Sequence, residues 1–228
     1  MNIIAGIDGT HPDLLPGEER DRRYDEAFRN SFVTRIARRG GNTAYWRGPV
    51  LLGGGLVPAI NGAVTHIERL VRSTRGLTNV LLTGYSRGGA GIVVVAKELA
   101  DRGINVRAML LFDAVDRQLF IDADVIPNNV AHVMHVVRDS RSSSRESFDN
   151  DGLRYRPPTR VDAFKFMCTH GAMGGCPAEL PPGGRLTDRI DEGGYDGMTT
   201  ITYQQDARVS QQVWNYVQPF INTYGFLR

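Results

Sequence analysis

Residues 78–90 read Thr-Asn-Val-Leu-Leu-Thr-Gly-Tyr-Ser-Arg-Gly-Gly-Ala, and the order of elements in this stretch decides the fold. Residues 78–83 form a short run with a β-branched, apolar centre, which predicts a buried strand. Residues 88–101 are small and apolar before they end in a charged turn, which predicts a buried helix. The two elements meet at Gly84-Tyr85-Ser86-Arg87-Gly88, a match to G-x-S-x-G, in which a serine occupies a sharp turn between a strand and a helix.

The alternation of short apolar runs and amphipathic stretches continues along the whole chain. The other strands are expected at residues 3–8, 105–112, 130–137 and 162–168, and the other helices at 18–39, 59–73 and 204–223. Strands that alternate with helices predict an α/β fold, with a mostly parallel sheet flanked by helices. We find no internal repeat and no linker, so we expect one domain over residues 1–228, in which 171–199, rich in glycine and proline, forms an ordered functional loop.

Composition and charge limit the classes of partner that this chain is expected to bind. Its 228 residues include 41% hydrophobic and 23% charged residues, the profile of a globular protein. The net charge is only +2, which argues against nucleic acid as a partner, because phosphate binding shows as a concentrated basic surplus. No apolar run reaches the ~20 residues that span a bilayer, and no signal peptide is visible. We therefore expect no transmembrane segment and a cytoplasmic location, with export by a route independent of a signal peptide as the alternative.

The turn around Ser86 has the residues that an exposed nucleophile requires. Gly84 and Gly88 are small where the turn brings backbone against backbone. The first N–H groups of the following helix and the positive end of its dipole stabilise developing negative charge, and the Arg87 N–H is the expected first oxyanion donor. Ser86 is therefore the candidate nucleophile, and the alternative is an ordinary glycine-rich turn with an incidental serine.

A serine hydroxyl needs a general base, and three histidines follow Ser86 in the chain. His132 and His135 lie inside a predicted apolar strand, on opposite faces, and are interpreted as partly buried structural residues. His170 lies where the last predicted strand ends, before a glycine-rich stretch. Loop ends of this kind carry catalytic groups, so His170 is the candidate base.

The acid that orients the histidine has two candidates. Asp113 follows the first strand after the nucleophile, and Asp139 follows the second. Either strand end can bring a carboxylate to the imidazole, so topology alone leaves both open. Asp116 and Asp122 are less well placed and are expected to be exposed.

Several motifs, taken in order, resemble one known family. They are Ile7-Asp8-Gly9-Thr10, Gly84-Tyr85-Ser86-Arg87-Gly88-Gly89, Phe112-Asp113-Ala114-Val115, Asp139-Ser140-Arg141 with Phe148 nearby, and Thr169-His170-Gly171-Ala172-Met173-Gly174-Gly175. Together they resemble the α/β-hydrolase family that includes the bacterial type VI secretion phospholipase effectors and their fungal relatives. The resemblance implies an α/β-hydrolase fold and a triad of Ser86, Asp113 and His170, with Asp139 supporting the histidine loop instead.

The resemblance has one further implication and two departures. The Asp8-Gly9-Thr10 turn is similar to the oxyanion loop of fungal-type lipases, which implies Thr10 as the second oxyanion donor; the alternative is a simple strand-ending turn. The acidic residue that follows the histidine in the family is replaced here by Gly171-Ala172-Met173. Family members carry membrane-binding elements for which this chain has no room. Ester hydrolysis is therefore expected more firmly than phospholipase activity.

The expected activity is that of a serine esterase or lipase acting through an acyl-enzyme on Ser86. It needs no metal and no organic cofactor, and its partner is a small-molecule or lipid ester, with transient contact to a lipid surface as an option. The alternatives are a thioesterase, acyltransferase or peptidase on the same fold, or an inactive binding module.

Smaller features complete the expectation. Residues 56–60 and 119–121 are candidates for a lid or acyl pocket, with core packing as the alternative. Arg141 and Arg145 are candidates for holding an anionic headgroup, with a solvated loop as the alternative. Two cysteines, Cys168 and Cys176, are too few for a disulfide scaffold or a zinc site and are expected to be reduced.

Overall fold

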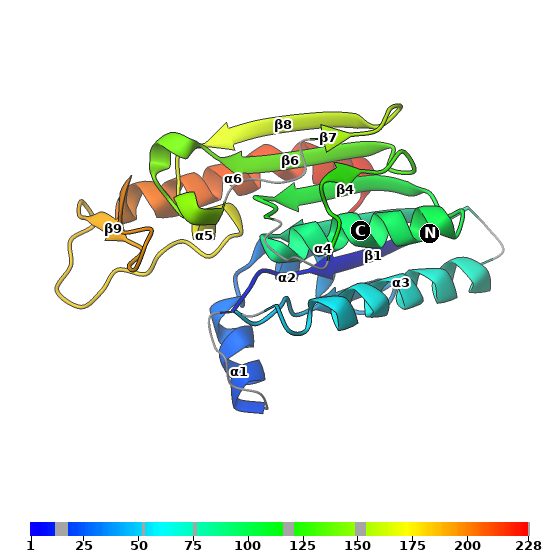
Figure 1. The fold of residues 1–228 in the computed structure, drawn as a ribbon, viewed down its shortest axis with the longest axis horizontal. Coiled ribbons are helices and arrows are strands. Elements are labelled where there is room, and N and C mark those ends of the chain that lie inside the picture. Colours follow the sequence, from blue (N-terminus) through cyan, green and yellow to red (C-terminus); the bar gives the residue numbers. More distant parts are fainter. Residues whose placement is uncertain (12–17, 52, 75–76, 116–120, 149–153, 228) are drawn as a thin grey trace.

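Six parallel strands form the central sheet, in the spatial order β2-β1-β3-β4-β6-β8. The computed structural model describes residues 1–11, 18–51, 53–74, 77–115, 121–148 and 154–227. The strands of the sheet are β1 (Asn2–Ile7), β2 (Thr43–Trp46), β3 (Asn79–Tyr85), β4 (Val106–Phe112), β6 (His132–Arg138) and β8 (Arg160–Phe166). Figure 1 shows the carboxyl ends of β4, β6 and β8 at the same side of the molecule, where α5 and β9 also lie. In a parallel α/β sheet this is the side where functional sites form.

Helices cover both faces of the sheet. They are α1 (Glu18–Ala27), α2 (Phe32–Ala37), α3 (Leu56–Ser73), α4 (Arg87–Asp101), α5 (His170–Met173) and α6 (Tyr203–Tyr224). One core packs α3 and α4 against side chains such as Ile3, Leu82 and Met109, and the other packs α1, α2, α5 and α6 against Ile4 and Leu81. Successive strand residues belong to different cores because side chains alternate across a strand. The predicted α/β fold, a mostly parallel sheet flanked by helices, is confirmed.

Short elements lie outside the main sheet. Two small pairs are β5 (Val125–Ile126) with β7 (Arg154–Tyr155) and β9 (Arg189–Asp191) with β10 (Met198–Thr202), and two 3-10 turns are η1 (Ser140–Ser142) and η2 (Glu146–Phe148). The predicted loop 171–199 thus contains most of α5, all of β9 and the start of β10. It contributes regular structure beside the carboxyl ends of the strands (Figure 1).

One predicted helix is wrong, because residues 18–39 form two helices. The side chain of Ser31 accepts a hydrogen bond from the Thr34 N–H at 2.9 Å, which caps α2 and ends any continuity with α1. The Phe32 N–H then donates to the Gly174 carbonyl at 2.8 Å, across the molecule. A serine side chain can bond to the local backbone, which favours the start of a helix over its interior. The apolar spacing continues on both sides of Ser31, and the prediction of a single helix depended on that spacing alone.

The interpretation of residues 56–60 as a lid is also wrong. These residues form the first turns of α3, and Leu56, Ala59 and Ile60 lie in the buried core. In the second candidate segment, residues 119–120 lie outside the described part of the chain, and Ile121 packs against the same core. The four-residue strand β2, at the sheet edge, was not predicted; its Thr-Ala-Tyr-Trp run is too short to show a period.

Candidate active site

Ser86 lies in a strained turn between β3 and α4. Its φ of 56° and ψ of −133° are rare for a residue with a side chain, and it is only 4% exposed. A Cβ at position 88 would come within 2.1 Å of the Asp8 carbonyl oxygen, and one at 84 within 2.7 Å of the Gly89 Cα. The two glycines of the motif are therefore required by close backbone contacts.

Three side chains form one continuous hydrogen-bonded chain at this turn. The Ser86 Oγ lies 2.8 Å from the His170 Nε2, and the His170 Nδ1 lies 2.6 Å from the Asp113 Oδ2. All three residues are buried, at 4%, 7% and 0% exposure. This arrangement can deprotonate the serine through the imidazole and stabilise the imidazolium that forms, which is the chemistry of acyl transfer.

His170 is held by contacts on several sides. Its backbone N–H donates to the Ser144 Oγ at 2.8 Å, and its carbonyl accepts from the Tyr85 hydroxyl at 3.0 Å. The Phe148 ring packs edge-on against the imidazole, with centroids 5.3 Å apart. These contacts fix both the backbone and the ring plane, so Nε2 stays directed at the serine.

Asp206, on α6, anchors the segment that carries His170. It accepts from the Thr169 N–H at 2.8 Å and hydroxyl at 2.9 Å, and from the Ala178 N–H at 3.0 Å. Burial raises the pKa of this carboxyl, because the three hydrogen bonds only partly offset the loss of water. The histidine segment is thus tied to the last helix.

Asp113 follows β4 and has a positive φ of 44°, which turns its carboxylate back towards the sheet end. Arg138 binds the same carboxylate as His170. It donates from Nη1 to the Asp113 Oδ2 at 2.6 Å and from its backbone N–H to Oδ1 at 3.0 Å. Burial by itself raises the pKa of the Asp113 carboxyl, but the hydrogen bonds and charges of His170 and Arg138 outweigh it and hold that pKa below its usual range.

Asp139, the alternative acid, has a different set of partners. Its carboxylate caps the short turn η1 and binds the Arg141 guanidinium at 2.7 and 3.0 Å. These bonds lower the pKa of Asp139 to about 2. The carboxylate that anchors the histidine loop belongs to Asp206. A supporting role of Asp139 in that loop stays a prediction.

The other titratable candidates lie away from the serine. His132 bridges the Tyr224 hydroxyl at 2.6 Å and the Asp162 carboxylate at 2.9 Å, and the buried His135 accepts from the Ala114 N–H at 3.2 Å through Nε2. His132 is partly buried, as predicted, whereas His135 is fully buried, and neither lines the cleft that contains Ser86. Asp122 is exposed and pairs with Lys97, whereas Asp116 lies outside the described residues.

The predicted oxyanion donors lie in the same cleft as the serine. Arg87 is the first residue of α4 and Thr10 follows β1, and both line the cleft that contains Ser86. The Thr10 Oγ1 is buried and has no hydrogen-bond partner among the residues that the structure describes. A buried hydroxyl without a partner is rare and suits a donor whose acceptor arrives with the substrate.

A buried network fixes the turn that carries Thr10. The Asp8 carboxylate accepts from the Gly9 N–H at 3.0 Å, the Tyr45 hydroxyl at 3.2 Å and the Thr34 hydroxyl at 3.2 Å, and also from the Ser31 hydroxyl. Burial raises the pKa of Asp8 from 3.8 to about 6, because these bonds only partly offset the loss of water.

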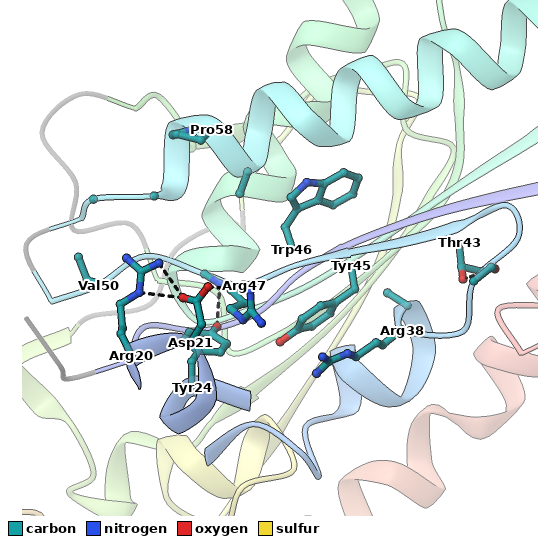
Figure 2. A pocket seen from close by; sticks show the side chains of 16 residues that line it. Arg20, Asp21, Tyr24, Arg38, Thr43, Tyr45, Trp46, Arg47, Val50 and Pro58 are labelled. Carbon is teal, nitrogen blue, oxygen red and sulfur yellow. Dashed lines mark hydrogen bonds and ion pairs between the residues drawn. The ribbon is translucent and has the colours of Figure 1, made fainter. Parts of the chain in front are cut away.

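Figure 2 shows a second pocket, with Tyr24 and Tyr45 among its lining side chains. Its volume is about 640 Å³. The Tyr24 hydroxyl donates to the Gly9 carbonyl at 2.6 Å and accepts from the Gly48 N–H at 2.7 Å. Arg47 crosses the same region to reach Asp21 and Asp25. Tyr24 and Tyr45, which line this pocket, therefore also hold the turn that carries Thr10, through their hydrogen bonds to Gly9 and Asp8.

The buried Asp8 carboxyl predicts how the free energy of unfolding changes with pH. The raised pKa means that the folded state binds a proton more tightly than the unfolded state does, so the stability that Asp8 provides falls as pH rises from about 4 to about 6. Compared with Asp8→Asn, which does not titrate, the wild type should lose about 3 kcal/mol over this window. Urea unfolding of both proteins at several pH values measures it; a difference that is constant with pH contradicts it.

The cleft around Ser86 has a volume of about 480 Å³. Its apolar wall includes Leu51, Val115, Phe148 and Ile190, and the Ser86 and His170 side chains lie at its base. Cys176 also lines it, as a thiol whose pKa is raised to about 12 by burial. Both cysteines are free, as expected. The lining residues give the cleft an apolar wall beside the Ser86 hydroxyl.

The two arginines considered for an anionic headgroup are both paired with carboxylates. Arg141 is exposed and binds Asp139. Arg145 lines the cleft, but it contacts Asp196 at 3.2 Å and Glu192 at 3.8 Å. Neither offers an unpaired charge to an anionic group.

Two residues of the site escaped the sequence analysis, Arg138 and Asp206. Arg138 ends an apolar strand, and a charge at such a position was the available signal. Asp206 lies within the first turn of a helix, where an acidic residue is ordinary, so no signal distinguished it.

Within the described part of the chain, no group of three histidine, cysteine, aspartate or glutamate side chains is arranged to hold a metal ion. Across the same ranges, none of the helices combines the length and the apolar character that crossing a bilayer requires.

Comparison with known proteins gives distant structural likenesses only. No family model and no curated protein matches the chain. An uncharacterised protein from Pseudomonas aeruginosa is similar at 15% identity and a TM-score of 0.45, over 77% of this chain and 42% of that one. An α/β-hydrolase superfamily protein from Enterococcus faecalis is similar at 14% identity and a TM-score of 0.28, over 50% and 39%. The chain thus spans about two fifths of the length of these two proteins.

The thioesterase RedJ from Streptomyces coelicolor, of the prodiginine pathway, is similar at 12% identity and a TM-score of 0.39, over 78% of this chain and 85% of that one. The assignment of the fold depends on the strand order and the serine turn of this chain itself.

Proposed function

We propose that this chain is a serine hydrolase that cleaves carboxylic esters through an acyl-enzyme on Ser86. The observation that carries the proposal is the chain of contacts from the Ser86 Oγ through the His170 imidazole to the Asp113 carboxylate, at 2.8 and 2.6 Å. The strained turn at the serine and the apolar cleft above it support the same reading. Small soluble esters and lipid esters are the proposed substrates, and the resemblance to the phospholipase effector family extends this proposal to phospholipids.

The mechanism has two steps with one proton carrier. The Ser86 oxygen attacks the ester carbonyl carbon while the His170 Nε2 takes the serine proton, and the Asp113 carboxylate holds the Nδ1–H and stabilises the imidazolium. His170 then gives the proton to the leaving alkoxide, which departs as an alcohol. Water repeats the sequence on the acyl-enzyme, which releases the acid and restores the serine.

The oxyanion of each tetrahedral intermediate is proposed to bind the Arg87 N–H and the Thr10 hydroxyl. Both residues line the cleft with Ser86, and the hydroxyl is buried without a partner in the described ranges of the chain. Preorganised donors of this kind stabilise charge that appears only in the transition state.

Removing the Thr10 hydroxyl therefore has a defined expected effect. Thr10→Val keeps the shape of the side chain and should lower kcat by about 10²-fold with little change in KM, because the lost bond forms only in the transition state. Thr10→Ser should keep most of the activity. Steady-state kinetics on a p-nitrophenyl ester measure both, with Thr65→Val on the exposed face of α3 as the matched control. A kcat of Thr10→Val equal to that of the wild type would remove the hydroxyl from the mechanism.

Reaction with a fluorophosphonate tests the proposed function itself. The wild type should form a phosphonyl adduct that peptide mass spectrometry locates on Ser86, whereas Ser86→Ala should form none. Lack of an adduct in the wild type would favour the inactive binding module.

A series of p-nitrophenyl esters, phospholipids and an acyl thioester then separates the possible acyl substrates. Cleavage of short soluble esters alone would exclude the lipase. Preference for the thioester would replace the ester as substrate.

A further inference from the structure

Arg138 contacts two members of the proposed triad from a buried position. It ends β6 and is only 5% exposed. Its Nη1 lies 2.6 Å from the Asp113 Oδ2 and 3.5 Å from the His170 Nδ1. The same carboxylate oxygen is therefore shared between a permanent cation and the imidazole.

The 3.5 Å contact brings two hydrogen-bearing nitrogens together. The His170 Nδ1 donates its proton to Asp113 at 2.6 Å, so it cannot also accept a hydrogen bond from Arg138. A neutral imidazole tolerates this neighbour, but an imidazolium beside it would bring two positive charges to one carboxylate. In a buried site such like charges are weakly screened.

Two further donors of Arg138 are directed at the backbone. Its Nε donates to the Ser144 carbonyl at 2.9 Å and its Nη2 to the Arg145 carbonyl at 3.0 Å. The Ser144 hydroxyl accepts from the His170 N–H at 2.8 Å, and Arg145 lines the cleft. The guanidinium thus joins the acid, the base and the cleft wall.

Other charged and titratable groups also surround the imidazole. From the elements packed around it, these are Asp113, Tyr85, Arg87, Arg145, Cys168, Cys176, Asp191, Glu192 and Asp206. Within the described part of the chain, the ring nitrogens of His170 contact two charged side chains, Asp113 and Arg138.

We propose that Arg138 is a positioning residue whose buried charge opposes protonation of His170 and thereby keeps the proposed base available at mildly acidic pH. This rests on the proposed function, in which His170 must be neutral to take the serine proton. Through the two hydrogen bonds from its Nε and Nη2, which are called the fork below, Arg138 also holds the segment from Ser144 to Arg145 against the histidine. Loss of the charge and loss of the two hydrogen bonds should have different measurable effects.

The test compares three substitutions at this position. The labelling rate with a fluorophosphonate is measured as a function of pH, and the acidic limb is the pH range in which this rate falls as His170 becomes protonated. In Arg138→Met and in Arg138→Gln, the acidic limb should move upward by ~1 pH unit, because the charge that opposes protonation is gone. Arg138→Lys should keep the wild-type limb, although its rate falls because the fork is lost. Arg141→Met, which removes a nearby exposed arginine, should leave the limb unchanged.

A merely structural role would lower the labelling rate of Arg138→Met without moving its limb, and that result would overturn the proposal. Circular dichroism establishes which variants fold, and Arg138→Gln carries the same expectation if Arg138→Met does not. An upward shift in the charge-retaining Arg138→Lys would also overturn it.

A second readout does not depend on catalysis. The chain has five histidines, so the ring signal of His170 can be identified in an NMR spectrum by its loss in His170→Asn. Its titration midpoint should rise by ~1 pH unit in Arg138→Met. A midpoint equal to that of the wild type would contradict the role of Arg138, whereas lack of labelling in the wild type would contradict the proposed function alone.

Discussion

Replacement of Ser86 by alanine is expected to lower kcat/KM for a p-nitrophenyl ester by about 10⁵- to 10⁶-fold while the protein stays folded. The hydroxyl removed is the atom that the His170 Nε2 contacts at 2.8 Å, and no acyl-enzyme can form without it. A small residual rate should persist, because the oxyanion donors and the cleft still bind the transition state.

The stability of this variant should not fall. The φ of 56° at position 86 strains any residue with a side chain, and alanine removes only a hydroxyl from the turn. Thermal unfolding of both proteins tests this part, and single-turnover kinetics test the loss of acylation. Ser73→Ala, at the exposed end of α3, is the matched control and should keep wild-type kinetics. A Ser86→Ala protein that hydrolyses esters within tenfold of the wild-type rate would refute the nucleophile.

The turn at Ser86 was predictable because its constraints are local. Gly84 and Gly88 are required by contacts within a few residues and with the first strand, and the strand and helix around them have clear patterns. His170 was predictable for a related reason: it is the histidine after Ser86 that no apolar strand contains. The two side chains can meet because the sheet is parallel: the carboxyl ends of β3 and β8, with β4 and β6 between them, lie at the same edge of the sheet.

The choice between Asp113 and Asp139 was not predictable from the strand ends. Each residue follows a parallel strand directly, and adjacent strands place both near the same edge. The backbone decides between them: Asp113 has a φ of 44°, whereas Asp139 stays extended and caps the next turn. No local sequence rule gives an aspartate a positive φ, and here the Arg138 contacts stabilise it.

Asp206 and β2 escaped prediction because they depend on distant contacts. Asp206 is separated from Thr169 by 37 residues, and its burial follows from the packing of α6 against α5. β2 pairs with β1 at the edge of the sheet, with all four of its residues half-buried, so its sequence has neither a strand period nor a long apolar run.

Replacement of Asp113 by asparagine is expected to lower kcat by about 10⁴-fold. The amide can place its oxygen towards Arg138 or towards His170, but it cannot give both the anionic acceptor they share at 2.6 Å. With the amide N–H₂ facing Nδ1, that nitrogen must accept, so the proton moves to Nε2 and the ring can no longer take the serine proton. Loss of the carboxylate also leaves the buried Arg138 without its counter-ion, which should destabilise the fold by about 3–5 kcal/mol.

Asp139→Asn is the matched comparison, because its carboxylate follows the neighbouring strand and also binds an arginine. That arginine is exposed, so solvent screens the pair and its loss should change kcat by less than about threefold. Initial rates at saturating ester, measured well below the unfolding temperature of each variant, compare the two residues. If Asp139→Asn were the inactive variant and Asp113→Asn kept near-normal turnover, the acid of the triad would be Asp139 and the histidine loop would have to move to reach it.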